Sequence, residues 1–262
     1  MNQVMSNDGT VIAFDRSGQG PAVILVGGAF QYRAIDPSTA QLAALLAQHF
    51  TVFHYDRRGR GESGDTQPYA VEREVEDLEA LIHEAGGSAF VFGMSSGGVL
   101  ALEAAARGLA ITKLAAYELP FNSGDEHARQ AAERYTQQLA ALLNEGRRGD
   151  AVALAMTTWG APPEAIAGMR QAPIWPLFEA VAPTLAYDDA IMGDGSVPTA
   201  RLASITVPTL VMDGGASPAF MHNAAQATAH ALPNGQRRTL EGQTHDVAPQ
   251  VLAPVLVEFF QG

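Results

Sequence analysis

The chain contains no cysteine among its 262 residues. This absence excludes disulfide bonds, a thiolate nucleophile and cysteine-based metal sites, and it fits a reducing compartment. Positive charge is also scarce, because 16 Lys and Arg stand against 28 Asp and Glu and leave a net charge of -12. An acidic protein of this kind repels nucleic acid and anionic lipid surfaces, so we expect neither as a partner.

Long apolar runs are missing as well. No stretch approaches the roughly 20 residues that span a bilayer, and the polar first ten residues lack the apolar centre of a signal peptide. No set of His, Asp and Glu has metal-ligand spacing, and no glycine-rich phosphate-binding loop is visible. We therefore expect a cytoplasmic monomer or homodimer that uses no metal and no cofactor.

What the chain does have is a regular alternation of short apolar runs and amphipathic segments. Strands are predicted over residues 11–15, 22–26, 51–55, 89–92, 114–117, 207–212 and 237–240. Helices are predicted over residues 41–49, 71–84, 99–107, 219–232 and 251–260. Alternation with short connections predicts an α/β fold with a mostly parallel central sheet and helices on both faces.

The alternation stops in the middle of the chain. Residues 122–199 read as largely helical and contain both tryptophans. We predict that this segment forms a helical cap, inserted into an α/β core made of residues 1–121 and 200–262.

The most informative motif is Gly93-Met94-Ser95-Ser96-Gly97, which follows an apolar run and precedes an Ala-rich helical stretch. A packing turn of small residues would look similar. The order of strand, tight turn and helix is, however, what a nucleophile elbow requires. The glycines leave room for the sharp turn, which strains the serine and exposes its hydroxyl. We predict that Ser95 is a nucleophile.

A serine nucleophile needs a base within hydrogen-bonding reach, and that base needs an acidic partner. Of the seven histidines, only His245 lies in the loop between the last strand and the last helix. That loop falls at the carboxyl edge of the sheet, where open α/β sheets bind ligands. His245 is therefore the predicted base.

Four segments together resemble the α/β-hydrolase superfamily over nearly the whole chain. They are Leu25-Val26-Gly27-Gly28-Ala29, Tyr55-Asp56-Arg57-Arg58-Gly59-Arg60-Gly61-Glu62-Ser63, the elbow, and Gly242-Gln243-Thr244-His245. The resemblance implies the α/β-hydrolase fold with a helical cap. An oxyanion hole needs two N–H donors, which we expect from Ser96 and from Ala29. We expect the arginines of the second segment to be solvated or paired with nearby acids.

The acid is where this sequence departs from the family. The usual Asp position holds Ser217, which cannot stabilise an imidazolium as a carboxylate does. Asp213 continues the preceding strand and falls too early to reach the histidine easily. Glu118 ends another strand between apolar neighbours, where an unpaired carboxylate is costly to bury. We predict Glu118 as the acid, with Asp213 as the alternative.

A displaced acid is also found in the zearalenone-lactonase-like branch of the superfamily, which this chain resembles more closely. The shared features are the two consecutive elbow serines, Glu118-Leu119-Pro120, the Gly215-Ala216-Ser217-Pro218 turn and Pro173-Ile174-Trp175. This resemblance implies a related enzyme with a triad glutamate directly after the strand predicted over residues 114–117.

Large apolar side chains are expected to line a pocket over the nucleophile. The candidates are Trp175, Trp159, Met156 and Phe30, with Met169, Leu177 and Phe178 as further ones. A pocket of this kind without a fixed cation favours a neutral ester or lactone.

We therefore predict a serine hydrolase that cleaves a carboxylic ester or lactone through an acyl-enzyme. A C–C bond hydrolase or a cofactor-free perhydrolase would use the same triad and remains open. A ligand-binding protein on a hydrolase scaffold is the non-enzymatic alternative, but it has no need of a base beside Ser95.

Overall fold

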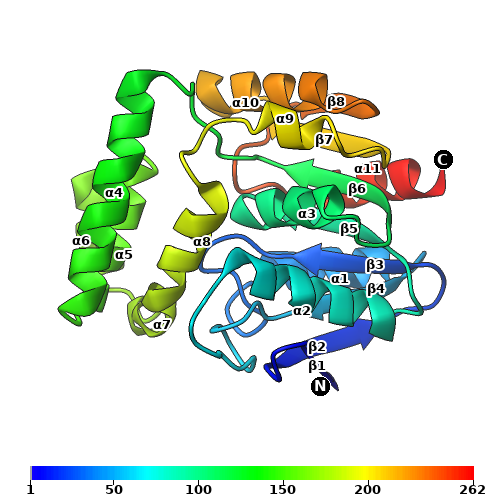
Figure 1. Cartoon of the computed structure of the whole chain (residues 1–262), viewed down its shortest axis with the longest axis horizontal. Helices are drawn as coiled ribbons and strands as arrows, with labels where there is room; N and C mark the ends of the chain where they lie inside the picture. Colours follow the sequence, from blue (N-terminus) through cyan, green and yellow to red (C-terminus); the bar gives the residue numbers. More distant parts are fainter. Residues whose placement is uncertain (1) are drawn as a thin grey trace.

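The computed structural model describes residues 2–262. An eight-stranded sheet forms the centre of the molecule, in the order β1-β2-β4-β3-β5-β6-β7-β8 (Figure 1). Only β2 runs opposite to the other strands, pairing antiparallel with β1 and β4, so the mostly parallel sheet expected from the sequence is confirmed. The strands are β1 (Asn2–Met5), β2 (Val11–Ser17), β3 (Ala22–Val26), β4 (Thr51–Tyr55), β5 (Ala89–Met94), β6 (Ile111–Tyr117), β7 (Thr209–Gly214) and β8 (Gly235–Leu240).

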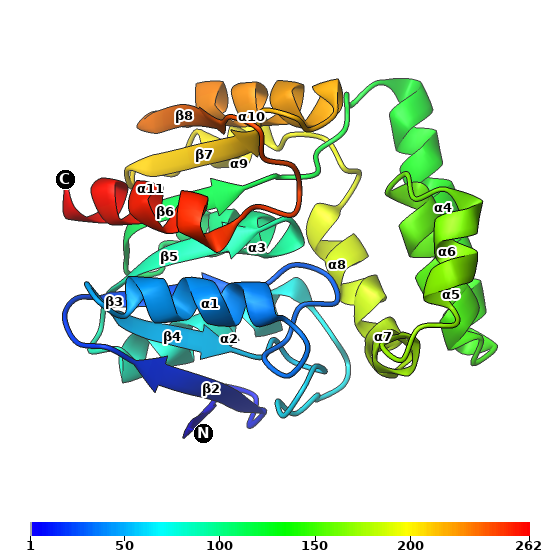
Figure 2. The same ribbon diagram turned by 180° about the vertical axis from the view of Figure 1, so that it is seen from behind.

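Helices cover both faces of this sheet. On one face α1 (Pro37–Leu46) packs beside α11 (Pro249–Gln261), as Figure 2 shows. The other face carries α2 (Val71–Glu84), α3 (Ser96–Ala106), α9 (Thr199–Leu202) and α10 (Ala219–Ala231). Two apolar layers result, one on each side of the sheet.

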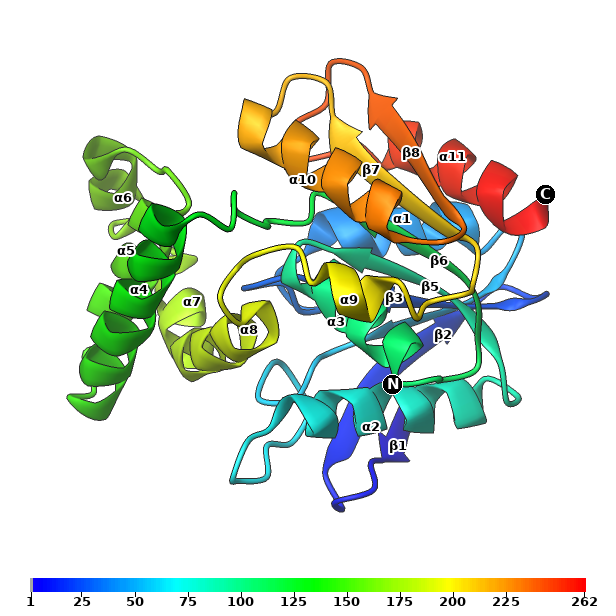
Figure 3. The ribbon, with the colours of Figure 1, turned by 45° about the horizontal axis from the view of Figure 1, so that its top comes forward.

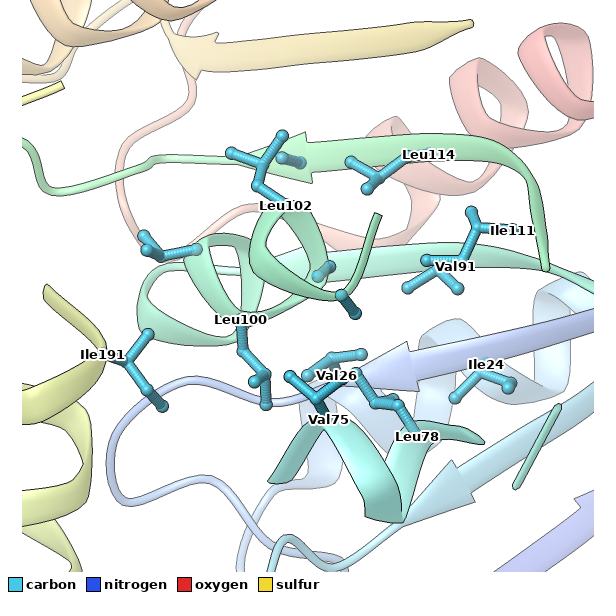
Figure 4. Close-up of a cluster of buried hydrophobic side chains, with 14 of the residues drawn as sticks. Ile24, Val26, Val75, Leu78, Val91, Leu100, Leu102, Ile111, Leu114 and Ile191 are labelled. Carbon is cyan, nitrogen blue, oxygen red and sulfur yellow. The ribbon is translucent and has the colours of Figure 1, made fainter. Parts of the chain in front are cut away.

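The central strands read as continuous apolar runs because both of their faces are buried. Along β3, Ile24 and Val26 belong to the layer under α2 and α3 (Figure 4), while Val23 and Leu25 belong to the layer under α1 and α11. Alternate side chains of one strand therefore serve opposite layers.

Five helices and a short 3-10 turn stand at the carboxyl ends of the parallel strands (Figure 3). They are α4 (Glu126–Asn144), α5 (Arg148–Thr158), α6 (Pro163–Met169), α7 (Trp175–Val181), the 3-10 turn Ala182–Thr184 and α8 (Leu185–Met192), and we call them the cap helices. A separate apolar cluster that includes Leu139, Val152, Ile166 and Leu185 packs them together. The α8 helix lies between the sheet and the other cap helices (Figure 1).

Two features at the N-terminal side were not predicted. The first is β1, which pairs with β2 at the edge of the sheet. Because this edge strand is mostly exposed, it needs no apolar run that the sequence could reveal. The α1 helix begins at Pro37, before the predicted residue 41, since Asp36 caps it by accepting the Thr39 N–H at 3.0 Å. No helix formed by residues 2–262 is long and apolar enough to cross a bilayer.

Candidate active site

Ser95 lies at the turn between β5 and α3 with φ 54° and ψ −128°. Its N–H donates to the Tyr117 carbonyl at 2.9 Å, which ties the turn to the neighbouring strand. The two motif glycines are required by contact: a Cβ on Gly93 would meet the main chain of α3, and one on Gly97 would meet the carbonyl oxygens of Val26 and Gly27. The local sequence therefore permits the strained serine.

We expect Gly97→Ala to lower the free energy of unfolding by about 1–3 kcal/mol, because main-chain atoms must move to admit the methyl group. Gly168→Ala in α6 is the control, since no atom lies within 4 Å of the added Cβ. Urea unfolding of both variants measures the difference. An unfolding midpoint for Gly97→Ala equal to that of Gly168→Ala would contradict the required close approach.

Glu118 follows β6 and is almost fully buried, with 1% of its surface exposed. One carboxylate oxygen accepts the Gly214 N–H at 2.7 Å, and the other lies 3.5 Å from His245 Nδ1. Burial opposes ionisation of Glu118. The nearby His245 imidazole and Ser217 hydroxyl, together with the Gly214 N–H, outweigh it and hold the pKa of Glu118 below its usual value. Glu118 therefore faces the histidine as a carboxylate.

Asp213, the alternative acid, is engaged elsewhere. It is fully buried, and its carboxylate contacts Arg237, His222 and Thr239. The Arg237 Nε donates to it at 2.9 Å. Of the two candidate acids, the structure brings Glu118 next to His245.

Hydrogen bonds from neighbouring segments hold the loop that carries His245. The Tyr117 hydroxyl donates to the carbonyl of Thr244 at 2.6 Å, and the Gln243 carbonyl accepts the Ala216 N–H at 2.8 Å. The His245 side chain itself is 47% exposed. The backbone around His245 is thus held in place by these hydrogen bonds, while its imidazole stays partly open to solvent.

The loop after β3 lies against the elbow. A Cβ on Gly28 would stand 3.0 Å from the Ser95 Cβ. The N–H of Gly28 is already taken by Gln31 Oε1 at 2.6 Å. In the part of the chain that the structure describes, the N–H groups of Ala29 and Ser96 have no acceptor. These two donors are the ones expected from the sequence for an oxyanion hole.

An aromatic cluster joins this loop to the cap helices. The Phe30 ring centroid lies 5.5 Å from that of Trp159 and 4.8 Å from that of Phe178. Trp159 is 51% exposed, and Met156 packs against the same apolar cluster as Phe30. Two of the predicted substrate-binding residues, Phe30 and Trp159, therefore lie side by side at the loop that carries Ala29.

Trp175 belongs to the buried centre of the same apolar cluster. It is 5% exposed within the apolar cluster of the cap helices, its Nε1 donates to Glu179 at 2.8 Å, and the Arg170 guanidinium lies 5.1 Å from its ring. These contacts account for its burial without a ligand. Its contact with substrate stays a prediction.

Backbone strain gathers around the same place. Among residues 2–262, the non-glycine residues with positive φ are Phe30, Ser95 and Glu118, at 61°, 54° and 54°. Such a conformation is costly for a residue with a Cβ and persists where surrounding contacts enforce it. All three follow the carboxyl ends of strands at the centre of the sheet.

The three loop arginines are paired with acids, which is one of the two alternatives expected from the sequence, and they are buried. Arg57, Arg58 and Arg60 are at most 1% exposed. Inward-facing acids of α2 and α8 neutralise them, which makes their burial possible. The partners at 2.7 Å are Glu74 for Arg57, Asp77 for Arg58, and Asp188 for both Arg57 and Arg60.

No group of three or more His, Asp and Glu side chains that could hold a metal ion occurs among the residues described.

The chain belongs to the alpha/beta hydrolase family, whose sequence profile matches residues 22–256. It is 59% identical to an alpha/beta hydrolase from Sphaerobacter thermophilus, with a TM-score of 0.89 over 99% of this chain and 100% of the other. The α/β-hydrolase fold expected from the sequence is therefore confirmed.

More distant structures share the fold. An esterase from Thermogutta terrifontis is 23% identical, with a TM-score of 0.71 over 99% of this chain and 96% of the other. The enol-lactonase from Burkholderia xenovorans is 22% identical, with a TM-score of 0.70 over the full length of both chains.

Proposed function

We propose that this hydrolase cleaves carboxylic esters or lactones of neutral, largely apolar compounds through a Ser95-His245-Glu118 triad. The observation that carries the proposal is the buried Glu118 carboxylate 3.5 Å from His245 Nδ1, at the sheet edge that also presents Ser95. A carboxylate at Nδ1 favours the tautomer with its proton there. The Nε2 atom is then left as the base.

In the proposed reaction His245 Nε2 removes the Ser95 hydroxyl proton as the oxygen attacks the substrate carbonyl. The tetrahedral intermediate carries its negative charge toward the N–H groups of Ala29 and Ser96. When it collapses, the C–O bond breaks and the alkoxide takes the proton from His245. Water, deprotonated by the same imidazole, then releases the acyl group and restores the serine. Glu118 stabilises the imidazolium in both halves of the reaction.

The substrate class follows from the walls of the site. Phe30 and Trp159 offer an aromatic surface next to the loop that carries Ala29, which suits an aromatic or long aliphatic group. The net charge of -12 disfavours anionic compounds. We further propose that the chain belongs with the zearalenone-lactonase-like branch, so that an aromatic macrocyclic lactone is the first compound to assay.

The nucleophile is tested by labelling with a fluorophosphonate, which forms a stable adduct with an activated serine. Peptide mass spectrometry is expected to find one adduct, on Ser95, in the wild-type protein and none in Ser95→Ala. An adduct on another serine, or none in a folded protein, would exclude the proposal.

The bond that is cleaved is tested by a panel of aryl esters, lactones and vinylogous diketones. Turnover of esters or lactones supports the proposal, whereas exclusive turnover of the diketones would reassign the enzyme as a C–C bond hydrolase. Binding of activated esters without any turnover would reassign it as a ligand-binding protein.

A further inference from the structure

A buried carboxylate of the cap helices reaches the residue after the nucleophile. Asp188 of α8 is 6% exposed, and its Oδ1 accepts the Ser96 hydroxyl at 2.7 Å. The same oxygen accepts Arg57 Nη1 at 2.7 Å, and Oδ2 accepts Arg60 Nη2 at 2.7 Å. One side chain thus binds the elbow and two buried guanidinium groups.

Both guanidinium groups continue to the loop after β3. Arg60 Nη1 donates to the carbonyl oxygen of Gly28, and Arg57 Nη1 lies 3.3 Å from that of Gly27. These carbonyls therefore point toward the network around Asp188.

The orientation of a carbonyl sets the orientation of the next N–H group. A trans peptide unit is planar, and its C=O and N–H point in opposite directions. Because Arg60 holds the Gly28 carbonyl on one side, the N–H of Ala29 is directed to the other. The preceding unit obeys the same rule, since the Gly27 carbonyl faces Arg57 while the Gly28 N–H donates to Gln31.

The network is electrically balanced and rigid. Burial opposes ionisation of Asp188, but the charges of Arg60 and Arg57 keep its pKa below the usual value. Glu74 binds Arg57 through two further hydrogen bonds of 2.7 and 2.8 Å. The ring of Tyr187, the residue before Asp188, stacks on that of Tyr69 at 3.8 Å, and the Tyr69 hydroxyl donates to Glu74 at 3.0 Å.

We propose that Asp188 is a positioning residue for the oxyanion hole, which orients Ala29 through Arg60 and fixes Ser96 through its hydroxyl. The inference rests on the proposed serine-hydrolase function. A cap helix then has a second role besides covering the site: the two oxyanion donors are directed at the substrate only while α8 is docked on the core.

The test compares Asp188→Asn with Asp77→Asn, using p-nitrophenyl butyrate as substrate and a trifluoromethyl ketone as inhibitor. Asp77 is a matched control, because it is also buried and binds Arg58 at 2.7 and 2.8 Å without touching the loop after β3. For Asp188→Asn we expect kcat to fall about tenfold to a hundredfold, with KM changed by less than about twofold. The inhibition constant of the ketone, which forms an oxyanion on Ser95, should rise by the same factor. Asp77→Asn should keep wild-type kcat.

Ser96→Ala provides a second variant that removes no charge and keeps the Ser96 N–H, so the assay does not depend on the folding of Asp188→Asn. Its kcat is expected to fall about threefold to tenfold at constant KM. A kcat in folded Asp188→Asn no lower than that of Asp77→Asn, or an unchanged kcat in Ser96→Ala, would overturn the positioning role alone. A wild-type protein that neither hydrolyses the ester nor binds the ketone would instead overturn the proposed function, and this inference with it.

Discussion

Replacing His245 by Gln is expected to lower kcat for ester hydrolysis by about a millionfold. Gln cannot take the Ser95 proton, so the hydroxyl stays a weak nucleophile. The double variant Ser95→Ala/His245→Gln should be no less active than either single variant, because the two residues act as one unit. Single-turnover assays with an activated aryl ester measure all three.

The exposure of the imidazole supplies a rescue experiment. Since the His245 side chain is 47% exposed, added imidazole should enter the space left in His245→Ala and restore part of the activity. His222→Gln is the control, because His222 binds the buried Asp213. Comparable losses in His222→Gln and His245→Gln would mean that the base has been assigned to the wrong histidine.

Glu118→Gln is expected to lower kcat by about ten-thousandfold. The amide keeps the shape and the hydrogen bond from Gly214, but it no longer stabilises the imidazolium and favours the wrong tautomer of His245. Initial rates at saturating substrate give kcat, and near-UV circular dichroism reports whether the fold is retained.

Asp213→Asn tests the alternative acid. We expect a folded Asp213→Asn protein to keep kcat near the wild-type value, although its stability should fall because Asp213 binds Arg237 and His222. A large loss of kcat in Asp213→Asn together with little loss in Glu118→Gln would return the acid to the end of β7.

The parts of the fold that could be predicted from the sequence are those with a local cause. The run at residues 22–26 is apolar throughout because helices cover both faces of the sheet at this strand. The sequence therefore predicted β3 with its observed bounds. The β1 strand carries no such signal, since pairing at an exposed edge makes little demand on side chains. The elbow could be predicted because steric limits fix glycine at two positions, Gly93 and Gly97, of a five-residue motif.

Among the residues around the candidate site, those with a local signal in the sequence could likewise be predicted and those without one could not. Glu118 stood out as a carboxylate between apolar neighbours. Asp188 did not, because Arg57 and Arg60 lie 131 and 128 positions away in the sequence. A signal did exist, since Asp188 falls at helical spacing between the buried residues Leu185 and Ile191. A charged residue on an apolar helix face indicates a buried partner.

Trp175 illustrates a different limit. Its size and its place in the cap helices favoured a role in the pocket, but a helix of seven residues has too few positions to indicate which side faces the core. Phe30 and Trp159 do lie near Ala29. Phe30 belongs to the loop after β3, and Trp159 lies at the end of α5.

The left-handed backbone at Phe30, Ser95 and Glu118 has a consequence for engineering this protein. Each of these residues raises the free energy of the folded state by about 1–2 kcal/mol relative to a residue with an ordinary negative φ. Together they reduce a free energy of unfolding that is typically only about 5–15 kcal/mol. Glycine would relax each position, so directed evolution for heat resistance alone would favour it there and remove the hydroxyl and carboxylate of the proposed triad. Selection for thermostability should therefore hold positions 30, 95 and 118 fixed and seek its gains in the outer helices.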